Sequence, residues 1–549
     1  MAPLQGQVED NVIKAATLVP YLSTSSTNTV REVYAPRHWQ DFAFMRNAAR
    51  VEFGDGSVAF DVHLDGLRNV RELEFRQCDF LEAPHALAHC RVLRFVSCDN
   101  LHDLSGLASV EHLDIAGSRL VAHIDALPAV RSIVTGSSFK SALPSSAAVT
   151  SVTAPAAAVP WCDLRSLTDL HLKQCHALPA TIPFQVDSVF LSSCEQLESV
   201  ACFRRAAHVE LVRTRLLAVD AFHGFSLLRS IRLQASTCLH DLSALRHVHE
   251  VSLSLCVNLQ DISPLAEANT VEISCCPQIH AVAALAHVPT LSLSRCADLV
   301  DLTGLTHNTV VRISECYRVE QVAMLGHHCH TVDISRCYRV TDAALLATGH
   351  VHTVSLNGCN VSEAAAGAAW RDHPTLHTLD LSNNWDVVDA AAFAHLHTVY
   401  LERTNVRDVA PLANVHTLSL AGCDGVHDVH ALATVHTLDL SHCMGVRDVA
   451  ALAFVRTLNL AGTLVEAVAA LATVYELNLS GCACVSDDQV NQLTHVHTLV
   501  LMGCAQLTRV DGLRFVHALN LANCIGLTDV TMLGHVHTLD LTGCINVRP

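Results

Sequence analysis

The sequence predicts an α/β solenoid, a superhelix of short repeats with one long parallel β-sheet on its concave face. Residues 415–434 (VHTLSLAGCDGVHDVHALAT) are followed directly by residues 435–454 (VHTLDLSHCMGVRDVAALAF). Leu418 and Leu438 occupy equivalent places 20 residues apart, and such self-similarity is the signature of a repeat fold. Leu418 and Leu420 alternate with polar residues, as in a strand with one buried face. The return path of about ten residues is too short for a helix with two loops, so the convex side should be mostly turns and 3₁₀ segments with few short helices.

Two regions are expected along the chain. Residues 1–29 carry no clear repeat and are interpreted as a cap or linker, with a short helix expected over 11–21. Residues 30–549 form the solenoid. Residues 30–33 and 51–53 are interpreted as degenerate first strands, and the frame is firm from Leu73 onward.

The strand anchors recur about every 20 residues and indicate roughly two dozen repeats. The pattern is irregular near 133–160, where Ser, Ala and Pro accumulate. Residues 361–370 and 486–493 contain helix-forming residues and are expected to be short helices with Ser caps. The clearest anchors are Leu73, Leu93, Leu113, Leu170, Val189, Val209, Ile231, Val251, Val271, Leu291, Val311, Val332, Val354, Leu379, Val399, Leu418, Leu438, Leu458, Leu477, Leu499, Leu519 and Leu539.

The unit Val-His-Thr-Leu-x-Leu-x-x-Cys, followed by Asp-Val-x-x-Leu, resembles the cysteine-containing form of the leucine-rich repeat. The resemblance implies a leucine-rich-repeat solenoid that uses its concave sheet to bind a partner. The unit also resembles the cysteine-bearing repeats of trypanosome proteins described as adenylate-cyclase regulators, a likeness that transfers no partner.

Most of the 23 cysteines recur once per repeat, as at Cys423 and Cys443. Such a column indicates inward packing and capping of backbone groups rather than disulfides or redox chemistry, since a buried free Cys behaves as a small hydrophobe. A reducing compartment is therefore expected, cytoplasmic or nuclear. Asp428 and Asp448 begin a turn, where Asp accepts backbone N–H bonds.

In many repeats a histidine directly precedes the threonine at the start of the strand. Stacking of the repeats places these histidines in one column. A metal site is one interpretation, but a line of single residues does not converge as zinc ligands must. A solvent-exposed rim is the simplest interpretation. A third is pH sensitivity, because stacked imidazoles repel one another when charged. We expect no metal and no cofactor. The column contains His249, His330, His352, His377, His397, His416, His436, His497, His517 and His537.

The outward strand positions supply the candidate binding residues, since they face the partner side of the sheet. They vary in charge and size in the first half of the chain, where discrimination between partners is most readily built, and Tyr400 with Arg403 forms a second expected patch. The candidate partner-binding residues are Glu74, Arg94, Asp114, His171, Phe190, Glu210, Arg232, Tyr400 and Arg403.

Composition limits the function classes. The net charge is −18 and no dense Lys/Arg cluster is visible, so nucleic acid is not expected as a partner. No apolar run approaches the about 18 residues of a membrane helix, so no membrane partner is expected. The first residues lack the positive charge of a secretory signal, so a secreted protein is not expected. Phosphate-binding glycine loops, nucleophile elbows and zinc-protease motifs are missing, so no enzyme is predicted.

We therefore expect a non-catalytic scaffold that binds a protein on the concave sheet. An alternative is an F-box-like substrate receptor of a ubiquitin ligase, because residues 18–22 and 37–42 faintly resemble the two ends of an adaptor-binding segment. The last repeat ends directly after its strand, so an uncovered C-terminal edge and self-association through it are also expected.

Overall fold

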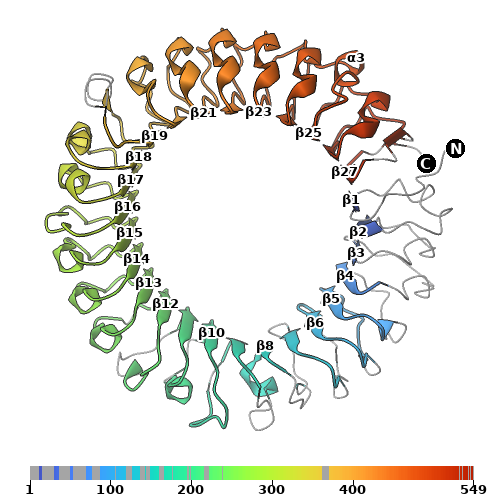
Figure 1. Ribbon diagram of the computed structural model, residues 1–549. Coiled ribbons are helices and arrows are strands. Elements are labelled where there is room, and N and C mark those ends of the chain that lie inside the picture. The colour runs from blue at the N-terminus through green and yellow to red at the C-terminus, as the bar shows by residue number, and fades with distance from the viewer. Residues whose placement is uncertain are drawn as a thin grey trace. The chain divides into compact units, whose positions relative to one another are not determined.

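The computed structural model describes residues 11–14, 30–35, 50–53, 70–76 and, with short gaps, 87–547. The gaps after residue 87 are 105–106, 119–120, 122–126, 136–142, 144–148, 160–165, 176, 195–196, 198, 215–221, 238, 362–369, 372, 531, 534–535, 542 and 545. The chain divides into two units, and each is described by itself. Within each unit the strands follow one another along the inner side of the coil, and the return segments lie on the outer side (Figure 1).

The first unit in the sequence covers residues 29–280 and is a ladder of parallel strands. Its strands are β2 (Val30–Ala35), β3 (Arg50–Phe53), β4 (Glu72–Arg76), β5 (Val92–Val96), β6 (His112–Ile115), β7 (Ser132–Thr135), β8 (Ser151–Pro155), β9 (Asp169–Lys173), β10 (Ser188–Ser192), β11 (His208–Val212), β12 (Ser230–Gln234), β13 (Glu250–Ser254) and β14 (Thr270–Ser274). Its 3₁₀ segments are η4 (Ala156–Ala158), η5 (Ala201–Phe203), η7 (Ser243–Leu245) and η8 (Ser263–Leu265).

The second unit covers residues 281–549 together with residues 1–28. Its strands are β1 (Asn11–Lys14), β15 (Thr290–Ser294), β16 (Val310–Ser314), β17 (Thr331–Ser335), β18 (Thr353–Ser355), β19 (Thr378–Asp380), β20 (Thr398–Tyr400), β21 (Thr417–Ser419), β22 (Thr437–Asp439), β23 (Thr457–Asn459), β24 (Glu476–Asn478), β25 (Thr498–Val500), β26 (Ala518–Asn520) and β27 (Thr538–Asp540). Its helical segments are η9 (Ala283–Leu285), η10 (Ala323–His327), η11 (Ala343–Thr348), η12 (Ala391–Phe393), η13 (Ala410–Asn414), η14 (His430–Thr434), η15 (Ala450–Phe454), η16 (Ala469–Thr473), η17 (Asp511–Phe515) and α3 (Asp487–Val490).

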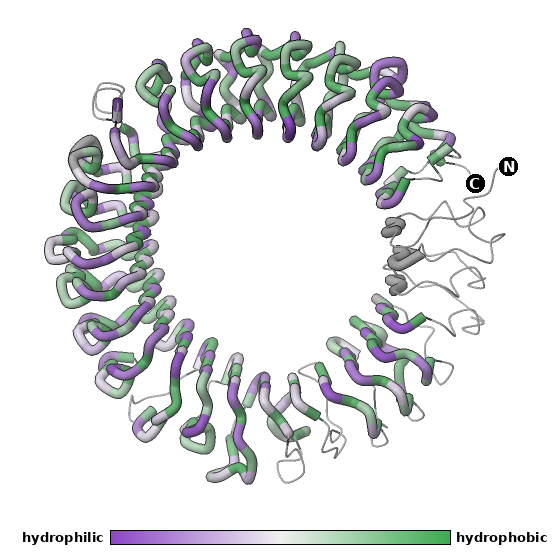
Figure 2. Tube along the Cα trace, in the orientation of Figure 1, coloured by the Kyte–Doolittle hydropathy of each residue, from purple (hydrophilic) through white to green (hydrophobic). Residues whose placement is uncertain are grey.

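The predicted anchors form a continuous apolar row inside each unit. Leu418 pairs with Leu438, and Leu438 pairs with Leu458, in parallel register. All three side chains are 1% exposed. Green hydrophobic and purple hydrophilic segments accordingly follow one another along the coloured turns in Figure 2. Burial of one such side chain stabilises the fold by about 1.5–3 kcal/mol, and a repeat obtains that burial only by stacking on its neighbours.

The cysteine column caps backbone carbonyls, as predicted. The Cys443 thiol donates to the Leu420 carbonyl at 3.0 Å, and the Cys423 thiol donates to the Leu401 carbonyl at 3.0 Å. Asn384 replaces cysteine in one repeat, and its amide donates to the Leu356 carbonyl at 2.9 Å. Each contact joins one repeat to the one before it, so the column ties the strand ends together.

The aspartates at the start of the return path accept backbone N–H bonds, also as predicted. The carboxylate of Asp448 accepts from the Ala450 amide at 3.0 Å, and that of Asp428 accepts from the His430 amide at 3.0 Å. These bonds fix the turns that open η14 and η15, whereas the start of η16 is bonded by the Gln489 side chain instead. The helical part of the return path is a 3₁₀ segment in most repeats. In contrast, α3 is a single α-helical turn after Ser486. The Ser486 hydroxyl makes no cap hydrogen bond, so that detail of the prediction is wrong.

The irregular stretch near 133–160 keeps the repeat frame, because β7 and β8 pair in register through Ile133 and Val152. The helix expected over 361–370 lies mostly outside the described residues, as do both segments of the F-box alternative. The boundary between a linker and the solenoid at residue 30 stays a prediction.

Two expectations about the chain ends are corrected. Residues 11–14 form strand β1 rather than the start of a helix. This strand pairs in parallel with β27, with Ile13 opposite Leu539. The edge of the last strand is therefore hydrogen-bonded, and the argument for self-association through an uncovered edge is wrong.

Candidate functional site

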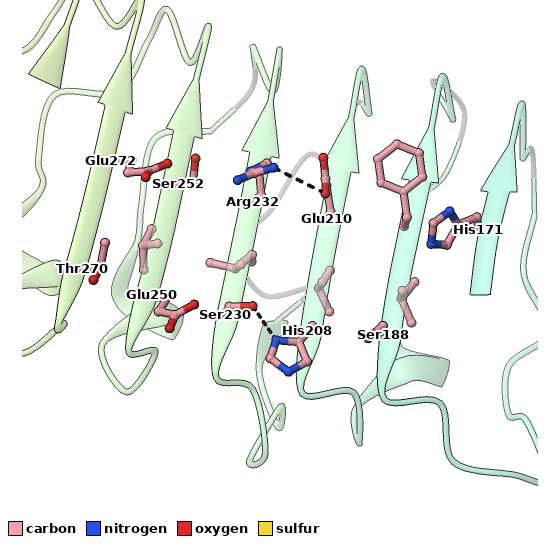
Figure 3. A pocket seen from close by; sticks show the side chains of 15 residues that line it. His171, Ser188, His208, Glu210, Ser230, Arg232, Glu250, Ser252, Thr270 and Glu272 are labelled. Atoms are coloured by element: carbon pink, nitrogen blue, oxygen red, sulfur yellow. Dashed lines mark hydrogen bonds and ion pairs between the residues drawn. The ribbon is translucent and has the colours of Figure 1, made fainter. Parts of the chain in front are cut away.

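A hollow on the sheet of the first unit extends across six successive strands, β9 to β14 (Figure 3). Its volume is about 390 Å³. It is lined by His171, Ser188, Val189, Phe190, His208, Val209, Glu210, Ser230, Ile231, Arg232, Glu250, Val251, Ser252, Thr270 and Glu272. A cavity of this size is in the range that binds ligands, and here its floor is the rigid face of a parallel sheet.

One row of outward side chains runs through the hollow because the strands are in register. His171 lies opposite Phe190, and Phe190 lies opposite Glu210. The row continues through Arg232 and Ser252 to Glu272. Side chains at these positions alternate with the buried anchors, so the core that holds the strands also fixes the spacing of the row.

The hollow begins with two aromatic rings. The centroids of the His171 and Phe190 rings lie 5.2 Å apart, with the planes tilted by 46°. Loss of hydration lowers the pKa of His171, and the carboxylates of Asp169 and Glu210 oppose this effect. The imidazole is therefore neutral at pH 7, and this end of the hollow offers apolar ring surface rather than charge.

An ion pair occupies the middle of the row. A guanidinium nitrogen of Arg232 lies 3.9 Å from a carboxylate oxygen of Glu210, and both side chains are partly exposed. Such an exposed pair contributes at most about 1 kcal/mol to stability. Beside it, Nδ1 of His208 hydrogen-bonds the Ser230 hydroxyl at 2.7 Å. This part of the hollow is polar, and its charges already balance one another.

The far end of the hollow is acidic. Glu250 and Glu272 are exposed, and among the described residues neither carboxylate has a hydrogen bond or an ion pair. In Figure 3 the Glu272 side chain extends toward Ser252 and the Glu250 side chain toward Ser230. These serines are small, so they leave open space beside two carboxylates that lack a counter-charge.

The other candidates of the first unit lie on β4 to β6, outside the hollow. Arg94 lies 4.0 Å from Glu74, whose side chain is only 6% exposed. Burial raises the pKa of Asp114, while its hydrogen bond from the Ala116 amide and the charge of Arg94 lower it. The structure thus brings Glu74, Arg94 and Asp114 together as an internal charge network, separate from His171, Phe190, Glu210 and Arg232.

The second expected patch, Tyr400 with Arg403, stays a prediction, and its two residues come from different local structures. Tyr400 points outward from β20, whereas Arg403 lies three residues later, in the turn beyond the strand. The backbone of Arg403 is left-handed, with φ of 53°. The equivalent position after a five-residue strand, Arg213 after β11, is left-handed as well, so this place in the repeat belongs to the turn.

Sequence reasoning did not select Glu250, Ser252 and Glu272. Ser252 and Glu272 follow Arg232 in the same outward column at the same spacing, so extending that column would have found them. Glu250 is the first residue of its strand, and no pattern in the sequence distinguishes it from other strand starts.

The histidine column of the second unit is a stack of rings. His377, His397, His416 and His436 follow one another with centroids 4.3 to 4.5 Å apart. His397, His416 and His436 are exposed, as in the predicted rim, whereas His352, His377, His497 and His537 are half-buried. Parallel rings direct their nitrogens side by side rather than toward one point. In the described part of the chain, no group of three or more His, Cys, Asp or Glu side chains is arranged to hold a metal ion.

No family model and no curated protein matches the sequence. Among solved structures the chain is similar to TLR13 in its complex with ssRNA13, with 12% identity, 97% of this chain and 91% of that chain covered, and a TM-score of 0.59. It also resembles the internalin InlF of Listeria monocytogenes, with 15% identity, 64% of this chain and 86% of that chain covered, and a TM-score of 0.27. The fold of the chain is a leucine-rich-repeat solenoid.

The TLR13 structure corrects one prediction. Nucleic acid was not expected as a partner because the chain is acidic. A protein similar in fold, TLR13, is solved in complex with single-stranded RNA, so that exclusion is wrong. Within the described residues, no helix is long and apolar enough to cross a membrane.

Proposed function

We propose that this protein is a non-catalytic scaffold that binds a segment of a partner protein in the hollow over β9 to β14. The observation that carries the proposal is the row from His171 to Glu272, in which aromatic, ionic and acidic side chains follow one another on a rigid sheet. Protein interfaces concentrate their binding energy in aromatic and arginine side chains surrounded by polar groups.

Rigidity supports the same proposal. The buried anchors on either side of the row, such as Val209 and Val251, are 3% and 1% exposed. Because these anchors are held in the core, the outward side chains lose little backbone freedom when a partner binds. Preorganisation of this kind increases affinity without additional contacts.

A protein segment fits the hollow better than a nucleic-acid backbone does. The lining residues include a single arginine, Arg232, and three glutamates, Glu210, Glu250 and Glu272. Phosphates would be repelled by this excess of carboxylates, whereas the basic side chains of a protein would be attracted. Nucleic acid is kept as an outcome of the test, since the fold accommodates RNA in TLR13.

Site-specific photo-crosslinking tests the proposal in the full-length protein. A photoreactive amino acid at Ser252 is compared with the same amino acid at Glu267, which is exposed and does not line the hollow. We expect a protein adduct from native extract with the Ser252 probe only. An adduct that disappears after nuclease treatment, or equal labelling from both positions, would contradict the proposal.

The captured partner is then purified and its affinity measured by calorimetry. Phe190→Ala should weaken binding by about tenfold or more, the effect of removing an aromatic anchor. Phe454→Ala is the matched control, because Phe454 is 86% exposed and lies on η15 in the other unit. Equal effects of the two truncations would mean that the hollow is not the binding site.

We also propose a reducing compartment, cytoplasmic or nuclear. Burial raises the pKa of the thiols of Cys359 and Cys443 to about 12, so both stay protonated and donate to carbonyls. A disulfide would remove these donors. Imaging of the tagged full-length protein tests the location, and accumulation in the secretory pathway would oppose it.

A further inference from the structure

We propose that the hollow recognises an extended protein segment that carries a basic side chain and, about four residues away, an apolar or aromatic side chain. The inference rests on the proposed function and adds to it the chemistry of the partner. It follows from the asymmetry of the hollow, which has ring surface at one end and uncompensated carboxylates at the other.

The acidic end forms a slot for a cation. Ser252 is hydrogen-bonded in register between Arg232 on one side and Glu272 on the other, and Glu250 starts the same strand as Ser252. The small side chains of Ser230, Ser252 and Thr270 line the space beside the two carboxylates. A lysine or arginine side chain that enters over Ser252 lies beside the Glu272 carboxylate, with the second carboxylate at the start of the same strand, and charge-assisted hydrogen bonds to carboxylates are the strong kind.

The ion pair in the middle fixes the orientation of the segment. Arg232 is compensated by Glu210 at 3.9 Å, so it does not neutralise the acidic end. Between Phe190 and Ser252 the row therefore carries no net charge, and the carboxylates without a counter-charge mark only one of its ends. A basic residue is therefore favoured only at the Glu250–Glu272 end, which sets one direction and one register.

The other end accepts an apolar side chain. Phe190 is only partly exposed, and the His171 ring packs beside it at 5.2 Å. An aliphatic or aromatic side chain placed there covers ring surface and displaces water, as anchors do at protein interfaces.

The distance between the two ends sets the spacing. Three strand steps separate Phe190 on β10 from Ser252 on β13, and each step is about 4.8 Å, so the ends lie about 14 Å apart. An extended chain that crosses the strands rises about 3.3 Å per residue, which corresponds to about four residues.

Selection from a displayed library of random peptides tests the inference with the full-length protein as bait. We expect enriched peptides with a lysine or arginine about four residues from an aromatic or aliphatic residue. Binding of an enriched synthetic peptide should fall by about tenfold for Glu250→Lys and for Glu272→Lys. Glu267→Lys alters net charge equally outside the hollow and should leave the affinity unchanged.

The outcomes separate the inference from the proposed function. Peptides that crosslink at Ser252 but are acidic, or that bind Glu272→Lys as well as they bind the unaltered protein, would overturn the partner chemistry and leave the binding face intact. Enriched peptides that do not reduce the crosslinking of the partner protein to the probe at Ser252 would overturn both the inference and the proposed function. Circular dichroism of each variant distinguishes a lost contact from a lost fold.

Discussion

The thiol of Cys443 lies 3.0 Å from the carbonyl oxygen of Leu420, one repeat earlier in the chain. The same carbonyl also accepts from the Cys423 amide at 3.0 Å, so it has two donors. Equivalent contacts to the preceding repeat recur at Cys504 and Cys524, whereas Cys194 and Cys276 donate to a carbonyl two residues earlier in their own repeat. The cysteines therefore act as hydrogen-bond donors in addition to filling space.

Cys443→Ala should destabilise the solenoid by about 1–2 kcal/mol, because it removes one buried hydrogen bond and some apolar contact. Cys443→Thr should cost less than about 1 kcal/mol. Thr463 occupies the equivalent place naturally, and its hydroxyl donates at 2.7 Å to the Leu460 carbonyl of its own repeat, so a threonine here fills the space and keeps its hydroxyl satisfied. Amide hydrogen exchange near residues 420–443 measures the effect locally, since long repeat arrays can unfold in parts. Cys484→Ala, at an exposed thiol, is the control, and an equal loss there would refute the role of the bond.

The stacked histidines should make the protein less stable in mild acid. Desolvation, followed by the neighbouring His377 and His416, lowers the pKa of His397 below its usual value. The unfolded chain therefore binds protons more readily than the folded chain as pH falls below about 6.5, the ordinary histidine pKa. The contribution of neutral His397 to folding stability is therefore fully present above that pH. It decreases as the pH falls toward the pKa of His397 in the folded chain. Melting curves at pH 7.5 and 5.5 should show a lower Tm at pH 5.5.

His397→Tyr separates stacking from titration. Tyr475 already occupies this column, with its ring 4.5 Å from that of His497. A tyrosine at 397 should keep the stack and reduce the difference in Tm between the two pH values. If the variant is as sensitive to acid as the unaltered protein, His397 is not the source of the effect.

The turn before the cysteine column requires a left-handed residue. Gly481 has φ of +65°, and a Cβ added there would meet no atom within 4 Å. Gly481→Ala should therefore cost about 1 kcal/mol from backbone strain alone. Gly481→Asn should cost less, because asparagine tolerates this conformation and Asn383 and Asn523 adopt it in equivalent turns. Thermal unfolding of the two variants checks the order, and equal destabilisation would point to another cause.

Much of the fold was predictable because one period governs it. Leu418 and Leu438 repeat at a fixed distance, and strand alternation then determines which side chains face inward. The same alternation selected His171, Phe190, Glu210 and Arg232 as outward residues of the hollow.

The remainder depends on features that the period does not encode. The hollow exists because small residues such as Ser252 stand beside larger ones, and that contrast appears only when strands are placed side by side. Left-handed turns at Leu255 and Arg295 have no glycine to indicate them. The pairing of β1 with β27 joins the two ends of the sequence, where no local pattern reports on contact.

A charge-swap cycle on the selected peptide tests the central claim most directly. The affinity of the basic peptide, and of its Lys→Glu or Arg→Glu form, is measured by calorimetry for the unaltered protein and for Glu272→Lys. The account predicts that each single change weakens binding and that the two changes together restore much of it, because the charges are in contact. Additive losses, with no recovery in the double change, would contradict recognition of a basic side chain at Glu272.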